Sequence, residues 1–207
     1  TINDLKDLLS IYSSDDFEGR QTGTKGDRTA ANFLREFYIN NQIEPALNTI
    51  DYFQPYQLNL PGEMYTRNYT FPDKLRAYNR YAEGVNFVDT QNVASIIKGE
   101  IYPDSYLIIT GHLDHVGIDG DEVYNGADDN GSGTVSILEI AQAFQEAVED
   151  GVRPKRSVVF LHVSGEEEGL LGSEYYVNNS LYPLEDTFAT LNLDMIGRTD
   201  PNRGYED

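Results

Sequence analysis

Four short, nearly continuous apolar runs constrain the fold of this chain more than any other feature of its sequence. They lie at residues 93–97, 106–110, 158–163 and 188–193. Runs of this kind are typical of strands that are covered on both faces. Helical periodicity predicts a long helix at about 131–149 and a shorter one at about 169–179. This alternation predicts an α/β protein, a three-layer α/β/α sandwich on a mostly parallel mixed sheet.

The region before these runs has a different pattern of apolar and polar residues. Helical spacing predicts helices at 2–12 and about 27–41, joined through a Gly/Thr-rich loop. From residue 50 to residue 80, Tyr, Phe, Asn and Pro alternate without helical period, which predicts an antiparallel strand region. The chain shows no internal repeat and no low-complexity segment, so we expect residues 1–207 to form a single domain.

Charge and composition narrow the classes of partner. The chain has 35 acidic and 15 basic residues, a net charge of −20, without a basic block, which argues against nucleic acid and anionic lipid. No apolar run approaches the roughly 20 residues that span a bilayer, so we expect no membrane insertion. The absence of cysteine excludes disulfides, thiolate nucleophiles and cysteine-based zinc sites. The acidity favours a cation as ligand.

Acidic residues follow each of the last three apolar runs and precede the long helix. In open α/β sheets, ligands bind at the carboxyl ends of the strands, so these side chains are expected to meet at one edge. They are Asp114, Asp128, Asp129, Glu166, Glu167 and Asp194. So many carboxylates cannot all stay ionised without protons or cations. Because His112 lies among them, nitrogen and oxygen ligation predicts zinc, with manganese or cobalt as alternatives.

The spacing of these residues suggests separate roles. His112 and Asp114 are two residues apart, so a strand places both side chains on one face, and Asp114 could hold the far imidazole nitrogen. Glu166 and Glu167 are adjacent and cannot point the same way, so one could bind metal while the other handles protons. Each motif alone has an ordinary structural explanation, such as a strand end, a solvated acidic face or a helix cap. Their recurrence at successive strand ends favours the metal site.

Four segments of the sequence, in this order, resemble the motifs of the co-catalytic di-zinc aminopeptidase superfamily. They are HLD at 112–114, GADDNGSG at 126–133, EEEGLLGS at 166–173 and NLDMIG at 192–197. The superfamily includes bacterial leucyl aminopeptidases, glutamate carboxypeptidases and glutaminyl cyclases, and residues 16–34 are similar to the leader of its exported bacterial members. The resemblance implies a phosphorylase/hydrolase-like fold. Residues 1–207 would form a single zinc-peptidase catalytic domain that lacks the last part of the fold.

The resemblance also implies a set of metal ligands. His112 and Asp194 would bind one zinc ion, Asp128 would bridge two, and Glu167 would bind the second. The family's remaining ligand is a histidine after the Asp-Met motif, and the sequence ends before it. We therefore expect two zinc ions in the complete enzyme and one or none in this chain. His115 is interpreted as a loop residue, with a lesser role as substitute ligand.

The resemblance assigns Glu166 as general base and Asp114 as the support of His112. It also implies a cis peptide between Asp128 and Asp129. His162, within an apolar run, is interpreted as a core histidine.

The implied activity is that of a metallopeptidase: an aminopeptidase that hydrolyses N-terminal residues from peptides through a metal-bound water. Its partner would be a peptide with a free N-terminus, and hydrolysis by the 207-residue chain is expected to be slow or absent. Two alternatives remain open, a glutaminyl-peptide cyclotransferase and a catalytically incomplete scaffold or binding domain. The family habit, together with a first residue other than Met, suggests a periplasmic or secreted protein. Side-chain preference and oligomeric state are not determined by the sequence.

Overall fold

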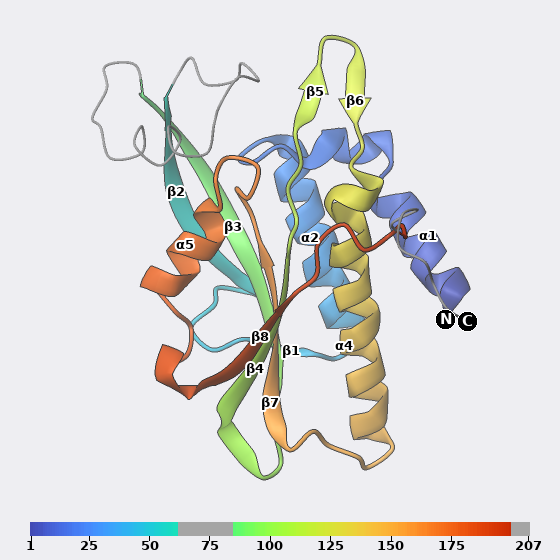
Figure 1. The fold of residues 1–207 in the computed structure, drawn as a ribbon, viewed down its shortest axis with the longest axis vertical. Helices are drawn as coiled ribbons and strands as arrows, with labels where there is room; N and C mark the ends of the chain where they lie inside the picture. The colour runs from blue at the N-terminus through green and yellow to red at the C-terminus, as the bar shows by residue number, and fades with distance from the viewer. Residues whose placement is uncertain (62–84, 200–207) are drawn as a thin grey trace.

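A mixed β-sheet lies at the centre of the computed structural model, which describes residues 1–61 and 85–199 (Figure 1). Its strands are β1 (Glu44–Pro45), β2 (Phe53–Pro61), β3 (Val85–Ile97), β4 (Tyr102–His112), β7 (Arg156–Val163) and β8 (Thr187–Asn192). The order is β1-β3-β7-β4-β8, and β2 also pairs with β3. Strands β7, β4 and β8 are mutually parallel neighbours, whereas β3 runs antiparallel to β7. All four apolar runs therefore lie in one sheet, as predicted.

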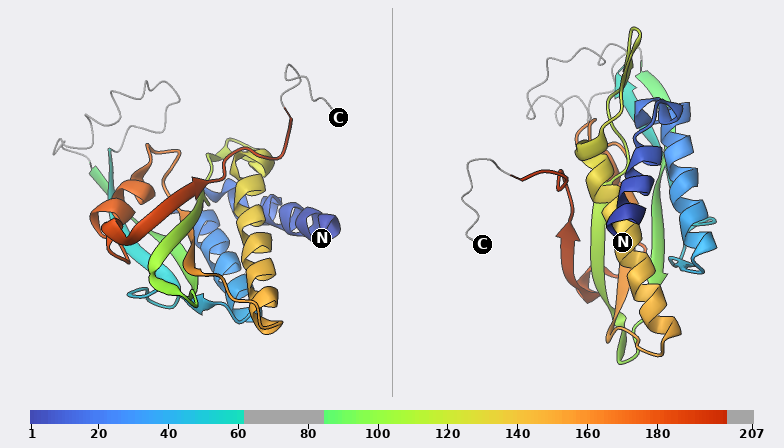
Figure 2. Two further views of the ribbon diagram at one scale, coloured as in Figure 1. Left: turned by 60° about the horizontal axis from the view of Figure 1, so that its bottom comes forward. Right: turned by 90° about the vertical axis from the view of Figure 1, so that its right-hand side faces the viewer.

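Helices cover both faces of the sheet (Figures 1 and 2). On one face lie α1 (Ile2–Tyr12), α2 (Lys25–Asn40) and α4 (Gly133–Glu149), and on the other lies α5 (Leu171–Asn178). Short turns complete the order: η1 (Asp15–Arg20), η2 (Ala127–Ser132) and η3 (Leu184–Asp186). The predicted three-layer α/β/α sandwich is confirmed.

The core consists of two main layers of apolar side chains, one on each face. On the first face, Leu34 of α2 and Leu138 of α4 belong to the cluster that includes Phe160 of β7. On the second face, Leu161 of β7 and Tyr176 of α5 belong to another cluster. Because consecutive strand residues point to opposite faces, β7 supplies both layers and reads as a continuous apolar run.

The predicted helices are present with small shifts at their ends. α1 has the predicted bounds, and α2 begins at Lys25 because the Thr24 hydroxyl caps it by accepting from the Asp27 amide. α4 begins at Gly133, two residues later than expected, because η2 forms an irregular turn in front of it. That turn carries the acidic pair of the candidate site.

Strand β8 differs from its prediction. Its apolar run was expected to be covered on both faces, but Phe188 is 64% exposed and Leu191 is 51% exposed. β8 pairs with β4 through one edge and ends the sheet order, and within residues 1–61 and 85–199 no strand pairs with its other edge. The expectation of two covered faces was therefore wrong for this strand.

The antiparallel region predicted at 50–80 is described only in part. β2 pairs antiparallel with β3, from Phe53 opposite Val93 to Pro61 opposite Val85, and residues 62–80 of the prediction lie outside the described residues. A small hairpin, β5 (Gly117–Asp119) with β6 (Glu122–Tyr124), was not predicted and projects beyond the sheet (Figure 1). Among the described residues, no helix combines the length and apolarity needed to cross a membrane.

Candidate metal centre

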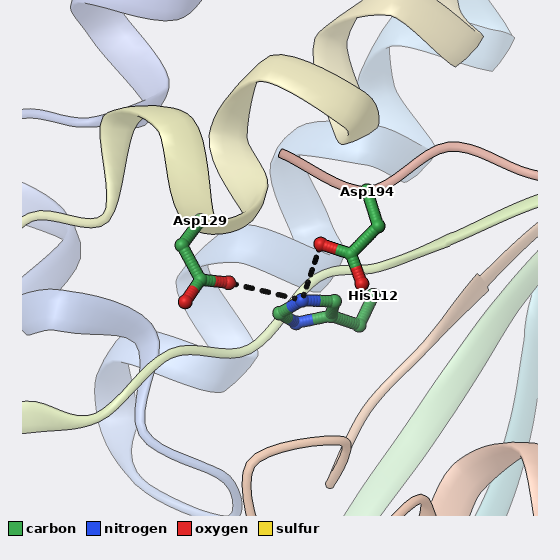
Figure 3. Close-up of side chains that lie close together, drawn as sticks. All are labelled: His112, Asp129 and Asp194. Carbon is green, nitrogen blue, oxygen red and sulfur yellow. Dashed lines mark ion pairs between the residues drawn. The ribbon is translucent and has the colours of Figure 1, made fainter. Parts of the chain in front are cut away.

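The carboxyl ends of three parallel strands bring the predicted site residues to one edge of the sheet. His112 is the last residue of β4, Glu166 lies three residues beyond the end of β7, and Asp194 lies two residues beyond the end of β8. Asp129 comes from η2, the turn that leads into α4. Segments far apart in the sequence therefore meet around the His112 ring (Figure 3).

The first ligand cluster consists of His112, Asp129 and Asp194. The Nε2 atom of His112 is 3.2 Å from Asp129 Oδ1 and 3.6 Å from Asp194 Oδ1, and both carboxylates point toward the ring (Figure 3). The three ligand atoms all lie within 4.8 Å of one another. The histidine side chain is 3% exposed, whereas the two carboxylates are partly open to solvent. One imidazole nitrogen and two carboxylate oxygens form a donor set that fits zinc.

The second ligand cluster consists of His115, Asp129 and Glu167. His115 Nδ1 lies 2.7 Å from Glu167 Oε1, and the three ligand atoms again lie within 4.8 Å of one another. Asp129 belongs to both clusters, so its carboxylate is placed to be shared between two neighbouring cations. His115, which the sequence offered only as a substitute ligand, thus lies beside Glu167 and Asp129.

Asp128, expected as the bridging ligand, belongs to neither cluster. Its carboxylate accepts a hydrogen bond from the Gly197 amide at 2.8 Å and is paired with the Arg198 guanidinium. Asp129 is instead the residue that contributes an oxygen to both clusters. The cis peptide is Asp129-Asn130, so the prediction of a cis bond between Asp128 and Asp129 was wrong by one residue.

Asp114 supports the site in a different way from the one predicted. The ring atom Nδ1 of His112 is 3.0 Å from the backbone carbonyl of Asp114 and 3.7 Å from its carboxylate. A proton on Nδ1 can be donated to that carbonyl, which leaves Nε2 facing the carboxylates. The buried Asp114 carboxylate accepts from the amides of Glu166 and Glu167, at 3.1 and 3.2 Å, and from the Thr22 hydroxyl. Asp114 therefore fixes the Glu166-Glu167 segment as well as the ring.

The carboxylates change the proton affinity of their neighbours. Burial alone lowers the pKa of His112, but hydrogen bonding and charge from Asp114 and Asp129 outweigh it and raise the pKa to about 11. Burial, with the neighbouring carboxylates of Asp114 and Glu167, raises the pKa of Glu166 above its ordinary value, although His112 opposes this. Without a cation, a proton on His112 compensates the acidic edge. A divalent ion would take over that compensation.

Asn130, which the sequence places at the start of the predicted long helix, is a structural residue of the site. It is 1% exposed, and its amide group donates to the Leu193 carbonyl at 2.9 Å. Its side-chain oxygen accepts from the amides of Gly133 and Met195, at 3.1 and 3.2 Å. Asn130 thereby attaches the segment that carries Asp194 to the beginning of α4.

Two further basic residues, one predicted and one not, are fully buried. His162 is fully buried, and its Nε2 atom lies 2.6 Å from the Tyr38 hydroxyl, so the prediction of a core histidine is confirmed. Burial lowers the pKa of His162 to about 3, which keeps it neutral. Arg20, which the sequence analysis did not single out, is also fully buried and reaches the loops of the site.

Comparison with known proteins gives matches of two kinds. Among curated proteins, "Probable glutamate carboxypeptidase VP8" of Zea mays is 34% identical over 115 residues, 55% of this chain. Aminopeptidase NAALADL1 of Rattus norvegicus is 33% identical over 124 residues, 59% of this chain. The chain spans only 15% of the length of each of these relatives.

Solved structures show the same fold. The aminopeptidase from Aneurinibacillus sp. strain AM-1 has a TM-score of 0.71 at 15% identity, covering 97% of this chain and 71% of that one. Glutaminyl cyclase from Porphyromonas gingivalis has a TM-score of 0.62 at 16% identity, covering 95% of this chain and 60% of that one. At these identities the likeness establishes the fold.

The family follows from the sequence match. Residues 92–206, which include both ligand clusters, match the peptidase family M28. This match covers more than half of the chain and confirms the resemblance to the di-zinc aminopeptidase superfamily. The protein is therefore a member of peptidase family M28, a family of zinc metallopeptidases.

Proposed function

We propose that this chain carries the catalytic centre of an aminopeptidase that uses two divalent metal ions, zinc by preference. The observation that supports this proposal most strongly is the pair of histidine-containing clusters that share Asp129. Membership of a peptidase family implies a peptide substrate. The proposal adds that the substrate is cleaved at its N-terminal residue.

The ligand roles follow from the two clusters. His112, Asp129 and Asp194 would hold one ion, and Asp129 with His115 and Glu167 would hold the other. Each set offers one imidazole and two carboxylates, which leaves a coordination position for water or substrate. Bound there, divalent ions lower the pKa of a coordinated water toward neutrality and polarise the scissile carbonyl.

Glu166 is proposed as the group that accepts and returns a proton. It belongs to neither cluster, yet its Oε2 atom is 4.0 Å from His112 Nε2, so it faces the ligands without being one of them. Its backbone amide is held by the Asp114 carboxylate, which fixes the segment that carries it. The raised pKa of Glu166 brings it closer to neutral pH, where a carboxylate both takes and gives up protons efficiently.

The charge of the chain favours N-terminal over C-terminal residues as substrate. A net charge of −20 and several carboxylates at the site attract the free α-ammonium group of a peptide and repel a terminal carboxylate. A carboxypeptidase requires a cation to hold that carboxylate. Arg198, which follows the segment of Asp194, is already paired with Asp128.

The test compares matched substrates and variants. The zinc-loaded chain should release leucine or alanine from aminoacyl anilides, and N-acetylation of the substrate should abolish release. Glu166→Gln should lower kcat by about two to four orders of magnitude while zinc binding persists, because only the proton transfer is removed. Glu174→Gln, an exposed change on α5, is the control. Near-normal turnover by Glu166→Gln would refute the assigned role.

Two other functions give different outcomes in the same assays. A glutaminyl-peptide cyclotransferase, which shares the fold, would cyclise a peptide with N-terminal glutamine and leave the anilides intact. A scaffold that has lost its chemistry would cleave neither substrate. The three carboxylates and two histidines of the paired clusters favour the peptidase, because a scaffold has no need for them.

A further inference from the structure

Arg20, at the end of η1, is a fully buried cation whose hydrogen bonds end on main-chain carbonyls. Buried guanidinium groups normally pair with a carboxylate. The acceptors here are the carbonyl oxygens of Leu113 (3.0 Å, from Nε), Tyr12 (3.0 Å, from Nη1), Asn125 (2.8 Å, from Nη1) and Gly126 (2.9 Å, from Nη2). The guanidinium also lies over the Tyr12 ring, 4.6 Å from its centroid.

Three of these four acceptors belong to the loops next to the metal ligands, and the fourth, Tyr12, ends α1. Leu113 immediately follows His112, and Gly126 precedes Asp129 by three residues. The backbone of Arg20 adds a further contact, since its carbonyl accepts from the His115 amide at 3.2 Å. One residue thus contacts the loop after β4 and the loop before η2, and through them it reaches both ligand clusters.

The position of the charge supports the same role. The guanidinium places a positive charge against the backbone of the loops next to Asp114 and Asp129. Its charge offsets part of the repulsion among the carboxylates of Asp114, Asp129 and Glu167, whose oxygens accept from main-chain amides or face the histidines of the two clusters.

We propose that Arg20 is a positioning residue of the metal centre. Its guanidinium fixes the separation between the loop after β4 and the loop before η2, which holds His112 and His115 within ligand distance of Asp129. The inference rests on the proposed metal-dependent function and assigns a device that maintains its geometry. Arginine is required because its planar guanidinium group offers five N–H donors in fixed directions. The ammonium group of lysine carries the same charge on one nitrogen atom and offers three N–H donors.

The experiment separates geometry from charge and from stability. Arg20→Lys keeps the charge and loses the planar set of N–H donors, and Arg20→Met loses both. Arg28→Lys and Arg28→Met are the controls, because Arg28 is exposed and donates to the Gly23 carbonyl, away from the ligand loops. Zinc affinity is measured by chelator competition, the absorption spectrum of bound Co²⁺ reports coordination geometry, and circular dichroism reports folding.

We expect both Arg20 variants to lose at least tenfold in zinc affinity and to change the Co²⁺ spectrum, while the Arg28 variants match the wild type. Folded Arg20 variants with wild-type spectra and affinities would overturn the proposal. Wild-type protein that binds no zinc would instead reject the metal centre itself. Zinc binding without peptidase activity would reject the proposed function and leave the role of Arg20 standing.

A measurement on the wild type covers the case in which the Arg20 variants do not fold. Zinc should slow amide hydrogen exchange in residues 14–24, where Arg20 lies, as well as in 110–116 and 124–133, where the ligand loops lie. If the two ligand loops become protected while 14–24 does not, Arg20 is not coupled to the metal centre and the proposal fails.

Discussion

Replacement of Asp129 by Asn should lower the affinity for both metal ions. The same change at its neighbour Asp128 should lower the affinity for neither. Asp129 contributes an oxygen to each ligand cluster, but the Asp128 carboxylate is occupied by the Gly197 amide and by Arg198. The two residues are adjacent, identical in type and within one turn. Their comparison therefore tests the position of the carboxylate rather than its presence.

The size of the effect follows from charge and exposure. Two unit charges 4 Å apart attract by about 4 kcal/mol at an effective dielectric constant near 20, and a divalent ion doubles that figure. The Asp129 side chain is 38% exposed, so solvent screens much of this attraction. We therefore expect a net loss of about 3 kcal/mol per ion, which corresponds to about a hundredfold loss of affinity.

The assay is competition with a chromogenic chelator, carried out on wild type, Asp129→Asn and Asp128→Asn at one pH and ionic strength. Asp129→Asn should lose about a hundredfold in affinity at both sites, and Asp128→Asn should stay within about threefold of wild type. If Asp128→Asn loses the second ion and Asp129→Asn retains it, Asp128 is the shared ligand and the assignment drawn from the structure is wrong.

Three further predictions concern the groups around the ligands. Asp114→Asn should lower the free energy of unfolding by about 1–3 kcal/mol, because an amide cannot accept from all three donors that the carboxylate serves; urea unfolding measures this. Asn130→Ala should cost about 2–3 kcal/mol, since three hydrogen bonds are lost at a buried position, and Asn130→Ala as stable as wild type would contradict the described contacts. In metal-free protein, the His112 pKa of about 11 exceeds its ordinary 6.5, so the proton stabilises the fold fully below pH 6.5 and this contribution is lost as pH rises toward 11. The melting temperature of the protein, measured with excess chelator, should therefore fall more steeply as pH rises for wild type than for His112→Gln.

The sequence was most informative where one local pattern has one structural solution. The apolar run of β7 is continuous because both of its faces are buried, and α1 has both a regular apolar spacing and a clear N-cap. The position of His112, Glu166 and Asp194 at one edge followed from the parallel order of the strands. These features depend on periodicity and topology, which a sequence displays directly.

The sequence was least informative where neighbours or distant segments decide the outcome. It could not separate Asp128 from Asp129, because their directions depend on the backbone of η2. It did not identify Arg20, because a single arginine in an N-terminal turn carries no sign that it reaches loops about one hundred residues away. It also gave His115 a minor role, because only the folded loop brings that ring to Glu167.

The number of zinc ions bound by the 207-residue chain is the most direct test of the paired metal centre. Native mass spectrometry, with calorimetric titration of the metal-free protein, gives this number. The sequence alone predicts one zinc ion or none in this chain, but the second cluster changes that expectation to two per wild-type chain. His115→Ala should bind one, since His115 contributes only to the second cluster. A wild-type chain that binds one ion or none, or a His115→Ala chain that keeps two with unchanged affinity, would contradict the paired metal centre.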